Sequence, residues 1–190
     1  MKKQFPGTLF LVVGNSGSGK DSIISEALKK YPKNLKTLHG VKRYITRPAS
    51  EYEKNISVTE KEFKKMKKAG DFALSWHIYH LYYGVPIQID EWLQKGEPVV
   101  VNVSRTIIDD ARTKYANLKV IFIKVPFEIT LKRIKERGRE DGEQLEERIE
   151  RAKTHQTCDN ADYVVDNSSK LEDAIDQFLD IIIKAQEGIQ

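Results

Sequence analysis

The sequence predicts an α/β protein in which helices cover both faces of a parallel sheet. Short apolar runs have the composition of strands buried on both faces, and segments with apolar residues at helical spacing follow them. The first run also ends in a glycine-rich segment that leads directly into a helical pattern. Because parallel strands are joined by crossover helices, this alternation is typical of a βαβ sheet.

Four apolar runs are predicted as strands of this sheet. The first is continuous and is closed by a glycine, as expected for a central strand. In chain order the predicted strands are Thr8 to Val13, Pro98 to Val103, Lys119 to Val125 and Asp162 to Val165.

Five segments with helical periodicity are predicted as the covering helices. They are Ser22 to Tyr31, Ile87 to Gln94, Ser104 to Tyr115, Phe127 to Arg137 and Leu171 to Ala185. Local signals agree, since Pro86 suits a first helical turn, Gly96 a helix end and Ser104 a cap. Thr59 and Glu62 have the spacing of a capping box for a further, smaller helix.

Two stretches interrupt the pattern. Arg43 to Gly84 combines short strands with one small helix, and Arg137 to Glu147 is almost wholly charged. Both are predicted to be lids over a site. Because the sequence contains no repeat, linker or low-complexity tract, residues 1–190 are predicted to form one domain that carries both lids.

Length and cysteine content limit the possible classes. No segment of the 190 residues approaches the run of about 20 apolar residues that a membrane helix needs. Pro6 and Gly7 break the first apolar stretch, which predicts a strand rather than an export signal. Cys158 is the only cysteine, which excludes an intrachain disulfide and a cysteine-based zinc site. We therefore expect a cytoplasmic protein.

The formal net charge of +4 permits an acidic ligand. Much of the positive charge lies in runs such as KEFKKMKK, residues 61–68, which are typical of a solvated helix face. We therefore expect neither nucleic acid nor a membrane as a partner.

Residues 14–20, GNSGSGK, match a phosphate-binding loop of the G-x-x-x-x-G-K type. The motif follows a predicted strand and opens a predicted helix, which is the context that it requires. Its glycines let backbone N–H groups face a phosphate, and Lys20 reaches the β- and γ-oxygens of ATP. The residues predicted to bind ATP are Gly14, Asn15, Ser16, Gly17, Ser18, Gly19, Lys20, Asp21 and Ser22.

Asp21 stands directly after the lysine, where such loops usually carry a serine or threonine that holds Mg²⁺. A carboxylate also binds this cation, and its charge beside the phosphates is tolerated mainly when the cation is present. We therefore predict that Asp21 contacts Mg²⁺ directly or through water, with Ser22 as the alternative ligand. ATP and Mg²⁺ are the expected cofactors.

The chain resembles the guanylate kinase branch of the nucleoside monophosphate kinases over nearly its full length. The matching segments are GNSGSGK, YITRP at 44–48, YYG at 82–84 and RIKERGRED at 133–141. The resemblance implies a P-loop kinase core with an acceptor-binding insertion at about 43–84 and an arginine-rich ATP lid at about 137–147. It also implies that Arg47 and Tyr83 grip the acceptor phosphate, which the planar fork of a guanidinium suits.

The positions that read the base in guanylate kinases are not kept. Arg43 and Leu74 stand where that family has a serine and the guanine-binding glutamate. Val85 replaces a serine or threonine, and Ser104 replaces an aspartate. A guanine would therefore find few of its hydrogen-bond partners, and such a mismatch discriminates strongly.

Other strings resemble the ribose 1,5-bisphosphate phosphokinases, among them GKDS at 19–22, RYITR at 43–47, LSWH at 74–77, LYYGV at 81–85 and VNVSR at 101–105. This resemblance implies ATP-dependent phosphorylation of ribose 1,5-bisphosphate to 5-phosphoribosyl 1-diphosphate. Compared with the base pocket of guanylate kinases, the corresponding positions here carry more positive charge, and this suits a second phosphate on the acceptor. The residues predicted to bind the acceptor are Arg43, Arg47, His77, Tyr83, Ser104 and Arg105.

The predicted chemistry is charge stabilisation. An oxygen of the C1 phosphate is the expected nucleophile, and it is ionised near neutral pH because the second pKa of a phosphate is about 6. No general base is then required. Lys20 is the first predicted catalytic residue, and the resemblance to the guanylate kinase lid implies that the lid arginines Arg133, Arg137 and Arg148 act with it on the ATP phosphates. It also implies that Asn102, where that family has an aspartate, orients a water bound to Mg²⁺.

Other roles stay open for several of these residues. Arginines can instead form ion pairs with neighbouring carboxylates, and this alternative applies to Arg43, Arg105, Arg133 and Arg148. Trp76 and Tyr82 are more typical of hairpin packing than of ligand stacking.

Two other functions also stay open. One is a guanylate kinase or a related nucleotide kinase, against which the altered base-reading positions count. The other is a noncatalytic guanylate kinase-like module that binds protein partners, against which the intact Gly19 and Lys20 count. The expected partners are ATP and a small phosphorylated substrate, and the sequence gives no oligomeric state.

Overall fold

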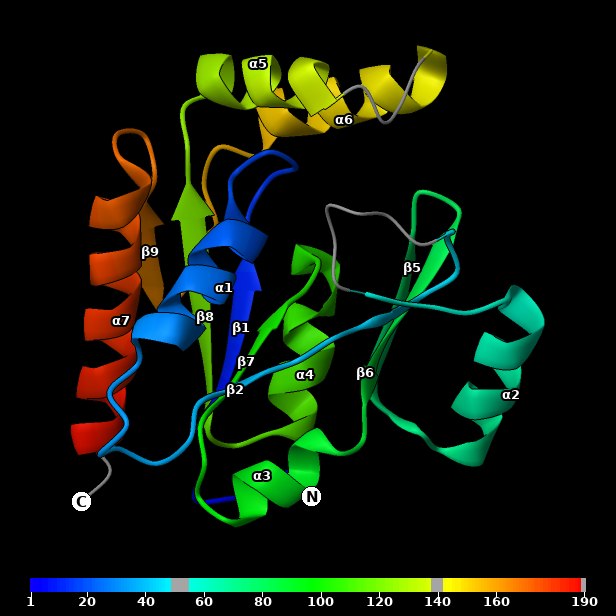
Figure 1. Cartoon of the computed structure of the whole chain (residues 1–190). Coiled ribbons are helices and arrows are strands. Elements are labelled where there is room, and N and C mark those ends of the chain that lie inside the picture. The colour runs from blue at the N-terminus through cyan, green and yellow to red at the C-terminus, as the bar shows by residue number, and fades with distance from the viewer. Residues whose placement is uncertain (49–54, 138–141, 189–190) are drawn as a thin grey trace. The chain divides into compact units, whose positions relative to one another are not determined.

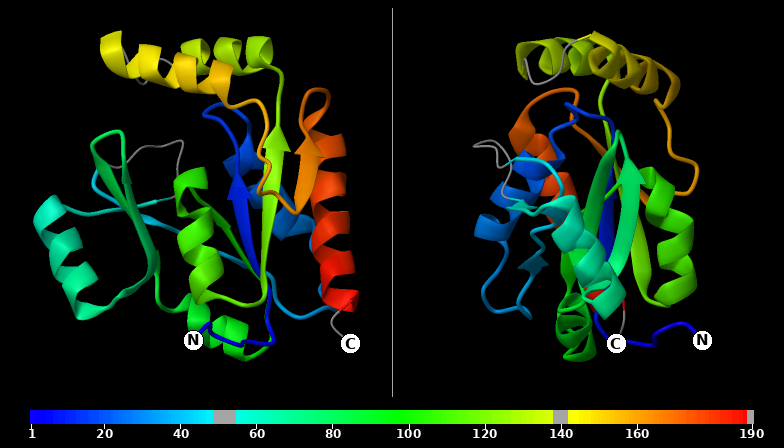
Figure 2. Two further views of the ribbon diagram at one scale, coloured as in Figure 1. Left: turned by 180° about the vertical axis from the view of Figure 1, so that it is seen from behind. Right: turned by 90° about the vertical axis from the view of Figure 1, so that its right-hand side faces the viewer.

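The computed structural model describes residues 1–48, 55–137 and 142–188 of the 190-residue chain. The protein is of the α/β class, with one five-stranded sheet and one four-stranded sheet (Figure 1). Helices lie on both faces of the five-stranded sheet (Figure 2), which confirms the predicted fold class.

The five-stranded sheet has the strand order β2-β7-β1-β8-β9. β2 pairs with β7 and β8 pairs with β9, both in parallel. All residues of β1 are buried, as predicted for a central strand. The bounds are β1 (Leu9–Val13), β2 (His39–Gly40), β7 (Val99–Asn102), β8 (Leu118–Lys124) and β9 (Tyr163–Asp166), of which only β2 was not predicted.

Two compact units make up the chain. The first consists of Met1–Leu11 and Pro32–Leu118, and the second of Val12–Tyr31 and Lys119–Gln190. The first unit contains the predicted acceptor-binding insertion, and the second contains the glycine-rich loop and the predicted ATP lid. The single domain expected for residues 1–190 stays a prediction.

The insertion folds as a small sheet with one helix, as predicted. Its strand order is β4-β3-β6-β5, and β5 and β6 form an antiparallel hairpin. Helix α2 lies against this hairpin in the views of both Figure 1 and Figure 2. The elements are β3 (Tyr44–Ile45), β4 (Ile56–Ser57), α2 (Glu60–Ala69), β5 (Phe72–Ile78) and β6 (Leu81–Pro86).

The predicted capping box begins α2. Thr59 Oγ1 accepts a hydrogen bond from the Glu62 N–H at 3.2 Å, and the Glu62 carboxylate accepts one from the Thr59 N–H at 2.7 Å. Phe63 is the buried residue of this helix, and its ring stacks on that of Phe72 with 4.6 Å between the centroids. A cap and one apolar anchor therefore fix a helix that is otherwise mostly charged.

The predicted helix over Ile87 to Gln94 begins later than expected, because α3 spans Ile89–Gln94. Pro86 is the last residue of β6, and the Ile87 N–H still donates to the Asp71 carbonyl at 2.8 Å. The placement of Pro86 in a helical turn was therefore wrong. A proline has no N–H to give to a ladder, so the end of a strand suits it equally well.

The helix predicted over Ser104 to Tyr115 is present as a short 3-10 helix, η1 (Arg105–Ile107), followed by α4 (Ile108–Lys114). Ser104 caps it as predicted, since its hydroxyl accepts a hydrogen bond from the Thr106 N–H at 3.4 Å. Gly96 follows α3 with φ of 77°, which also confirms the predicted helix end.

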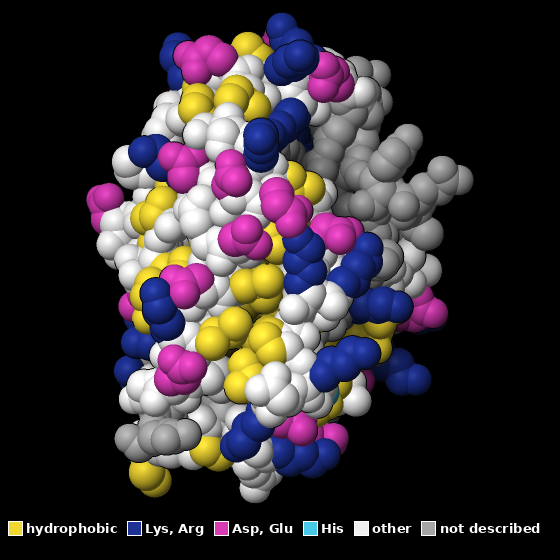
Figure 3. Space-filling view, turned by 60° about the vertical axis from the view of Figure 1, so that its left-hand side comes forward, with side chains coloured by type: hydrophobic (Ala, Val, Ile, Leu, Met, Phe, Trp, Pro, Cys, Tyr) yellow, Lys and Arg dark blue, Asp and Glu magenta, His cyan; other side chains and the backbone are white. Residues whose placement is uncertain are grey.

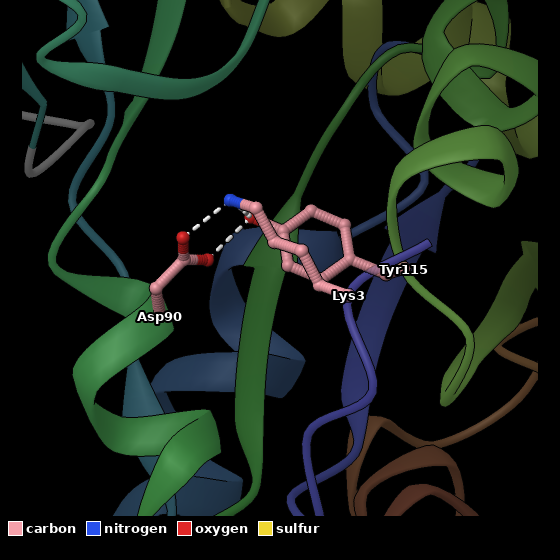
Figure 4. A network of polar contacts seen from close by, with 3 residues as sticks. All are labelled: Lys3, Asp90 and Tyr115. Atoms are coloured by element: carbon pink, nitrogen blue, oxygen red, sulfur yellow. Dashed lines mark hydrogen bonds and ion pairs between the residues drawn. The ribbon is translucent and has the colours of Figure 1, made fainter. Parts of the chain in front are cut away.

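A polar network ties the N-terminal segment into the first unit (Figure 4). The Lys3 ammonium forms an ion pair with Asp90 of α3, and the Tyr115 hydroxyl donates to Asp90 Oδ1 at 2.6 Å. Burial, together with the Asp90 carboxylate, raises the pKa of Tyr115 well above its ordinary value. Lys3 also lies over the Tyr115 ring, 5.0 Å from its centroid. One carboxylate thus joins three segments that are distant in sequence.

The second unit places four helices with β8 and β9. Helix α7 packs against both α1 and β9, and α5 and α6 lie side by side (Figure 1, Figure 2). The helices are α1 (Lys20–Lys30), α5 (Phe127–Arg137), α6 (Gly142–Thr154) and α7 (Leu171–Glu187). Helical periodicity predicted α1, α5 and α7. It did not predict α6, whose first residues lie in the charged stretch.

No helix among the described residues combines the length and the apolar character needed to cross a membrane. On the face drawn in Figure 3, basic and acidic side chains are interspersed, and apolar side chains form small patches between them. This face therefore carries both signs of charge.

Candidate active site

The glycine-rich loop joins β1 to α1, as the motif requires. Gly19 precedes α1 with φ of 87°, in the left-handed region that favours glycine. A Cβ at Gly19 would also lie 2.6 Å from Asn167 Nδ2, so close that the Asn167 side chain would have to move. Backbone conformation and close packing therefore both require glycine at this position.

Lys20 is held by its own loop. Its Nζ donates to the carbonyl oxygens of Gly14 at 2.8 Å and Asn15 at 2.9 Å, and to Ser18 Oγ at 3.2 Å. Phosphate oxygens are stronger acceptors for an ammonium than these neutral groups. The loop therefore presents a cation at the position where the motif places the phosphates of ATP.

Asn167 is a contact of this loop that the sequence analysis missed. It follows β9, is 2% exposed, and donates from Nδ2 to the Ser18 carbonyl at 2.8 Å. Its own N–H donates to the carbonyl of Lys124, the last residue of β8, at 2.9 Å. An asparagine directly after a predicted strand was the available signal, but a lone asparagine does not identify its partner.

Two of the predicted lid arginines contact the loop. Arg133 of α5 donates from Nη1 to the Gly17 carbonyl at 3.3 Å, and Arg148 of α6 donates from Nη1 to Ser16 Oγ at 3.0 Å. Two cations from different helices thus lie at one phosphate-binding loop. The side chain of Arg137 lies outside the described residues, so its role stays a prediction.

The candidate Mg²⁺ contacts stay predictions. Asp21 lies in the first turn of α1, beside Ser22, and Asn102 is a buried residue at the end of β7. Among the described residues, no group of three histidine, cysteine, aspartate or glutamate side chains could hold a metal ion. The single carboxylate of Asp21 fits Mg²⁺, which protein sites usually bind through one or two carboxylates together with substrate phosphates.

In the first unit, an arginine and two aromatic rings form a stack. The β5–β6 register places Trp76 opposite Tyr83, and their rings are parallel to within 2° at 5.2 Å between centroids. The Arg43 guanidinium carbon lies 5.7 Å from the centroid of the Tyr83 ring. Arg43 is only 8% exposed, and no carboxylate among the described residues is paired with it. A buried guanidinium that pairs with no carboxylate of the described residues is suited to an anionic ligand.

Leu74 and Val85 are paired in the same hairpin, and each is 0% exposed. They occupy two of the positions at which the guanylate kinase resemblance expects base-reading polar groups. Apolar side chains offer a base no hydrogen-bond partner at either position.

The structure does not bring His77 together with Arg43. Successive side chains of a strand point to opposite faces of the sheet, so His77 and Trp76 lie on opposite faces. His77 is exposed and lies 4.4 Å from the ring of Tyr82, which in turn packs on Phe63 of α2. Tyr82 therefore has the packing role that the sequence left open.

The remaining predicted acceptor residues lie in the same unit. The Arg47 carbonyl accepts a hydrogen bond from Ser57 Oγ at 2.5 Å, which fixes the chain directly after β3. Arg105 begins η1, which packs against β5, the strand of Trp76. The Ser104 hydroxyl also accepts from Thr106 Oγ1 at 3.0 Å, so it caps η1. Its contact with an acceptor stays a prediction.

Comparison with known proteins agrees with this arrangement. A family model described as guanylate kinase matches residues 7–185. A protein of Rhodopseudomonas palustris named "Ribose 1,5-bisphosphate phosphokinase PhnN" is 40% identical over 77% of this chain and 75% of its own length. A protein of the same name from Enterobacter lignolyticus is 38% identical over 93% of this chain and 92% of its own length.

Solved structures show the same fold at low sequence identity. Guanylate kinase from Anaplasma phagocytophilum is similar with a TM-score of 0.72 and 19% identity, covering 98% of this chain and 89% of that chain. A gluconokinase from Sinorhizobium meliloti is similar with a TM-score of 0.52 and 17% identity, covering 98% and 97% respectively.

Proposed function

Because the chain belongs to the guanylate kinase family and is a phosphotransferase, we propose that it transfers the γ-phosphoryl group of ATP to ribose 1,5-bisphosphate. The product would be 5-phosphoribosyl 1-diphosphate. Relatives named for this activity, at 38–40% identity, support the assignment.

The observation that carries this proposal is the Arg43–Tyr83–Trp76 stack next to apolar base-reading positions. A guanine would leave its polar edge unpaired against Leu74 and Val85, which costs affinity for a nucleotide acceptor. A buried guanidinium instead attracts a phosphate group. An acceptor with two phosphates and no base is the ligand that matches both features.

ATP would bind at the glycine-rich loop of the second unit. The loop N–H groups and Lys20 would hold the β- and γ-phosphates, and Arg133 and Arg148 supply further positive charge at the same loop. Asp21 would hold Mg²⁺ directly or through water, with Ser22 as the alternative ligand, and Asn102 would orient a water bound to Mg²⁺. Mg²⁺ would neutralise phosphate charge there.

Transfer would need no acid or base from the protein. An oxygen of the C1 phosphate forms a bond to the γ-phosphorus of ATP, and the bond from that phosphorus to the β–γ bridging oxygen breaks to release ADP. The attacking phosphate is already ionised near neutral pH, since its second pKa is about 6. The cationic groups would then act by holding the phosphates in line and neutralising charge on the moving group.

The setting of this activity is part of the same proposal. We propose a cytoplasmic enzyme whose partners are ATP and a small phosphorylated sugar, with no role for nucleic acid or a membrane. A noncatalytic interaction module is disfavoured because Lys20 and both described lid arginines lie at the loop.

ADP release from Mg-ATP tests the proposal, with ribose 1,5-bisphosphate, GMP and no acceptor measured in parallel. We expect strong release with the sugar bisphosphate alone. Release with GMP and none with the sugar bisphosphate would overturn the assignment and indicate a nucleotide kinase. Failure to bind Mg-ATP at all would favour the interaction module.

A further inference from the structure

We propose that Asn15 is a positioning residue that holds helix α6 against the glycine-rich loop, so that Arg148 is fixed where the nucleotide phosphates bind. This inference rests on the proposed binding of ATP at the loop. Asn15 is the second residue of the GNSGSGK segment. Its side-chain amide, however, makes hydrogen bonds to the lid helix and so acts between the two elements.

The Asn15 amide uses both of its donors on the C-terminal end of α6 and the residue that follows it. Nδ2 donates to the Ala152 carbonyl at 3.2 Å and to the His155 carbonyl at 3.0 Å. An amide nitrogen has two N–H groups, so both are engaged. The flipped orientation would set the amide oxygen against two carbonyl oxygens, so these contacts define which way the amide points.

Both carbonyls lie where a helix ends and its last carbonyl groups lack the usual N–H donor one turn further on. Ala152 lies in the last turn of α6, and His155 directly follows the helix. The Ala152 carbonyl also accepts a hydrogen bond from the Gln156 side-chain amide, so Asn15 shares this group with a neighbouring residue. Ala152 is also buried, so water has little access to its backbone. Asn15 therefore caps α6 from a different element, which alanine, glycine or proline at this position would not do.

The preceding turn of α6 carries Arg148. Residues 148 and 152 are four apart and so lie on one face of the helix. Arg148 Nη1 donates to Ser16 Oγ at 3.0 Å, directly beside the residue that caps the helix. Two adjacent loop residues thus hold two successive turns at the end of α6. Without the Asn15 bonds, the end of the helix loses its anchor, and the arginine loses the support that fixes its position.

A double-mutant cycle tests this role. The measured quantity is the affinity for the Mg²⁺ complex of a non-hydrolysable ATP analogue, obtained by calorimetry. It is compared for the wild type, Asn15→Ala, Arg148→Ala and the double variant. The interaction energy between two residues of one hydrogen-bond network is typically large enough to change a binding affinity about tenfold. We expect Asn15→Ala to weaken binding about tenfold in the wild type and to have no further effect in the Arg148→Ala background. An equal loss in both backgrounds would overturn the proposal.

Asn117→Ala is the matched control. Asn117 Nδ2 also donates to two backbone carbonyls, those of Pro6 at 3.3 Å and Gly7 at 3.2 Å, but in the other unit. We expect the control to bind the analogue like the wild type. A loss equal to that of Asn15→Ala would show a general effect of lost hydrogen bonds and would also overturn the proposal.

Two further features keep the result interpretable. Asn15→Ser, whose shorter side chain cannot span to both carbonyls, repeats the cycle if Asn15→Ala does not fold by circular dichroism. The binding measurement uses no acceptor, so a failure of ribose 1,5-bisphosphate to react would count against the proposed function and not against the role of Asn15.

Discussion

At the scale of single residues, the assignment of the glycine-rich loop depends most on Lys20. Its ammonium bridges Gly14, Asn15 and Ser18, so removing it takes a cation away from the whole loop. We predict that Lys20→Ala lowers kcat at least about a hundredfold, the usual effect of losing one preorganised group that stabilises transition-state charge. Circular dichroism should show an intact fold.

Lys29→Ala is the control for this variant. Lys29 lies on the same helix, and its exposed ammonium pairs with Glu26 at 2.6 Å. Its loss should leave turnover unchanged, because exposed ion pairs contribute little. Turnover at the wild-type rate in Lys20→Ala would contradict the assignment of the loop.

Arg43 allows a second test at this scale. We predict that Arg43→Met lowers kcat/KM for the acceptor about 10- to 150-fold, the equivalent of the roughly 1.5–3 kcal/mol that a hydrogen bond to a charged group contributes. Affinity for Mg-ATP should not change. The unfolding midpoint without acceptor should stay or rise, since a buried cation that pairs with no described carboxylate is replaced by an apolar side chain of similar length.

The neighbouring Lys42→Met is the matched variant, because Lys42 is exposed. It should leave all three quantities unchanged. If Arg43→Met instead unfolds the protein and leaves acceptor kinetics of the folded fraction intact, Arg43 has the ion-pair role that the sequence left open.

Sequence identified some of these residues and missed others for definable reasons. Lys20 and Gly19 were predictable because their motif is local and its context is a strand and a helix. Asn167 was missed because its contact with Ser18 joins residues that are distant in sequence. His77 was grouped with Arg43 because sequence proximity to Trp76 does not show that adjacent strand residues face opposite ways.

At the scale of elements, α2 has a cap that can be tested. We predict that Thr59→Ala destabilises the protein by about 1 kcal/mol, the usual effect of losing an N-cap side chain. The unfolding midpoint in urea, followed by circular dichroism, measures it. Thr37→Ala, at an exposed position before β2, should have no such effect. An equal midpoint for Thr59→Ala and wild type would contradict the capping role.

The same cap should depend on pH. Hydrogen bonds from the Thr59 N–H and hydroxyl hold the pKa of Glu62 below its ordinary value. A carboxyl with a lowered folded-state pKa stabilises the fold above its unfolded pKa, and this contribution is lost as the pH falls through the folded value. The difference in unfolding free energy between Thr59→Ala and the wild type should therefore become smaller in acid. A difference that grows as the pH falls would contradict this.

Element boundaries were predictable where local chemistry sets them. The Thr59 capping box and the Ser104 cap are confirmed because side-chain hydrogen bonds within three residues define them. Pro86 was misplaced because the hairpin ladder, which joins β5 to β6, continues to that residue. Periodicity did not predict α6, because its first residues lie in the charged stretch and its contacts with Asn15 and Ser16 come from a loop that is distant in sequence.

At the scale of the whole molecule, the sequence predicted the α/β class and four of the five strands of the larger sheet. Periodicity and buried apolar runs sufficed because each helix and strand follows a local pattern. The division into two compact units was not predicted, since contacts between distant segments define it. The proposed reaction assigns ATP to one unit and the acceptor to the other, so it depends on both.

The most direct test of the central claim is the ³¹P NMR spectrum of the product made from Mg-ATP and ribose 1,5-bisphosphate. Attack by the C1 phosphate predicts two mutually coupled resonances of a sugar diphosphate, with the C5 phosphate resonance retained and ADP formed in equal amount. A new uncoupled phosphate ester would place the transferred group on a ring hydroxyl. That result, or a diphosphate formed from GMP alone, would contradict the proposed function.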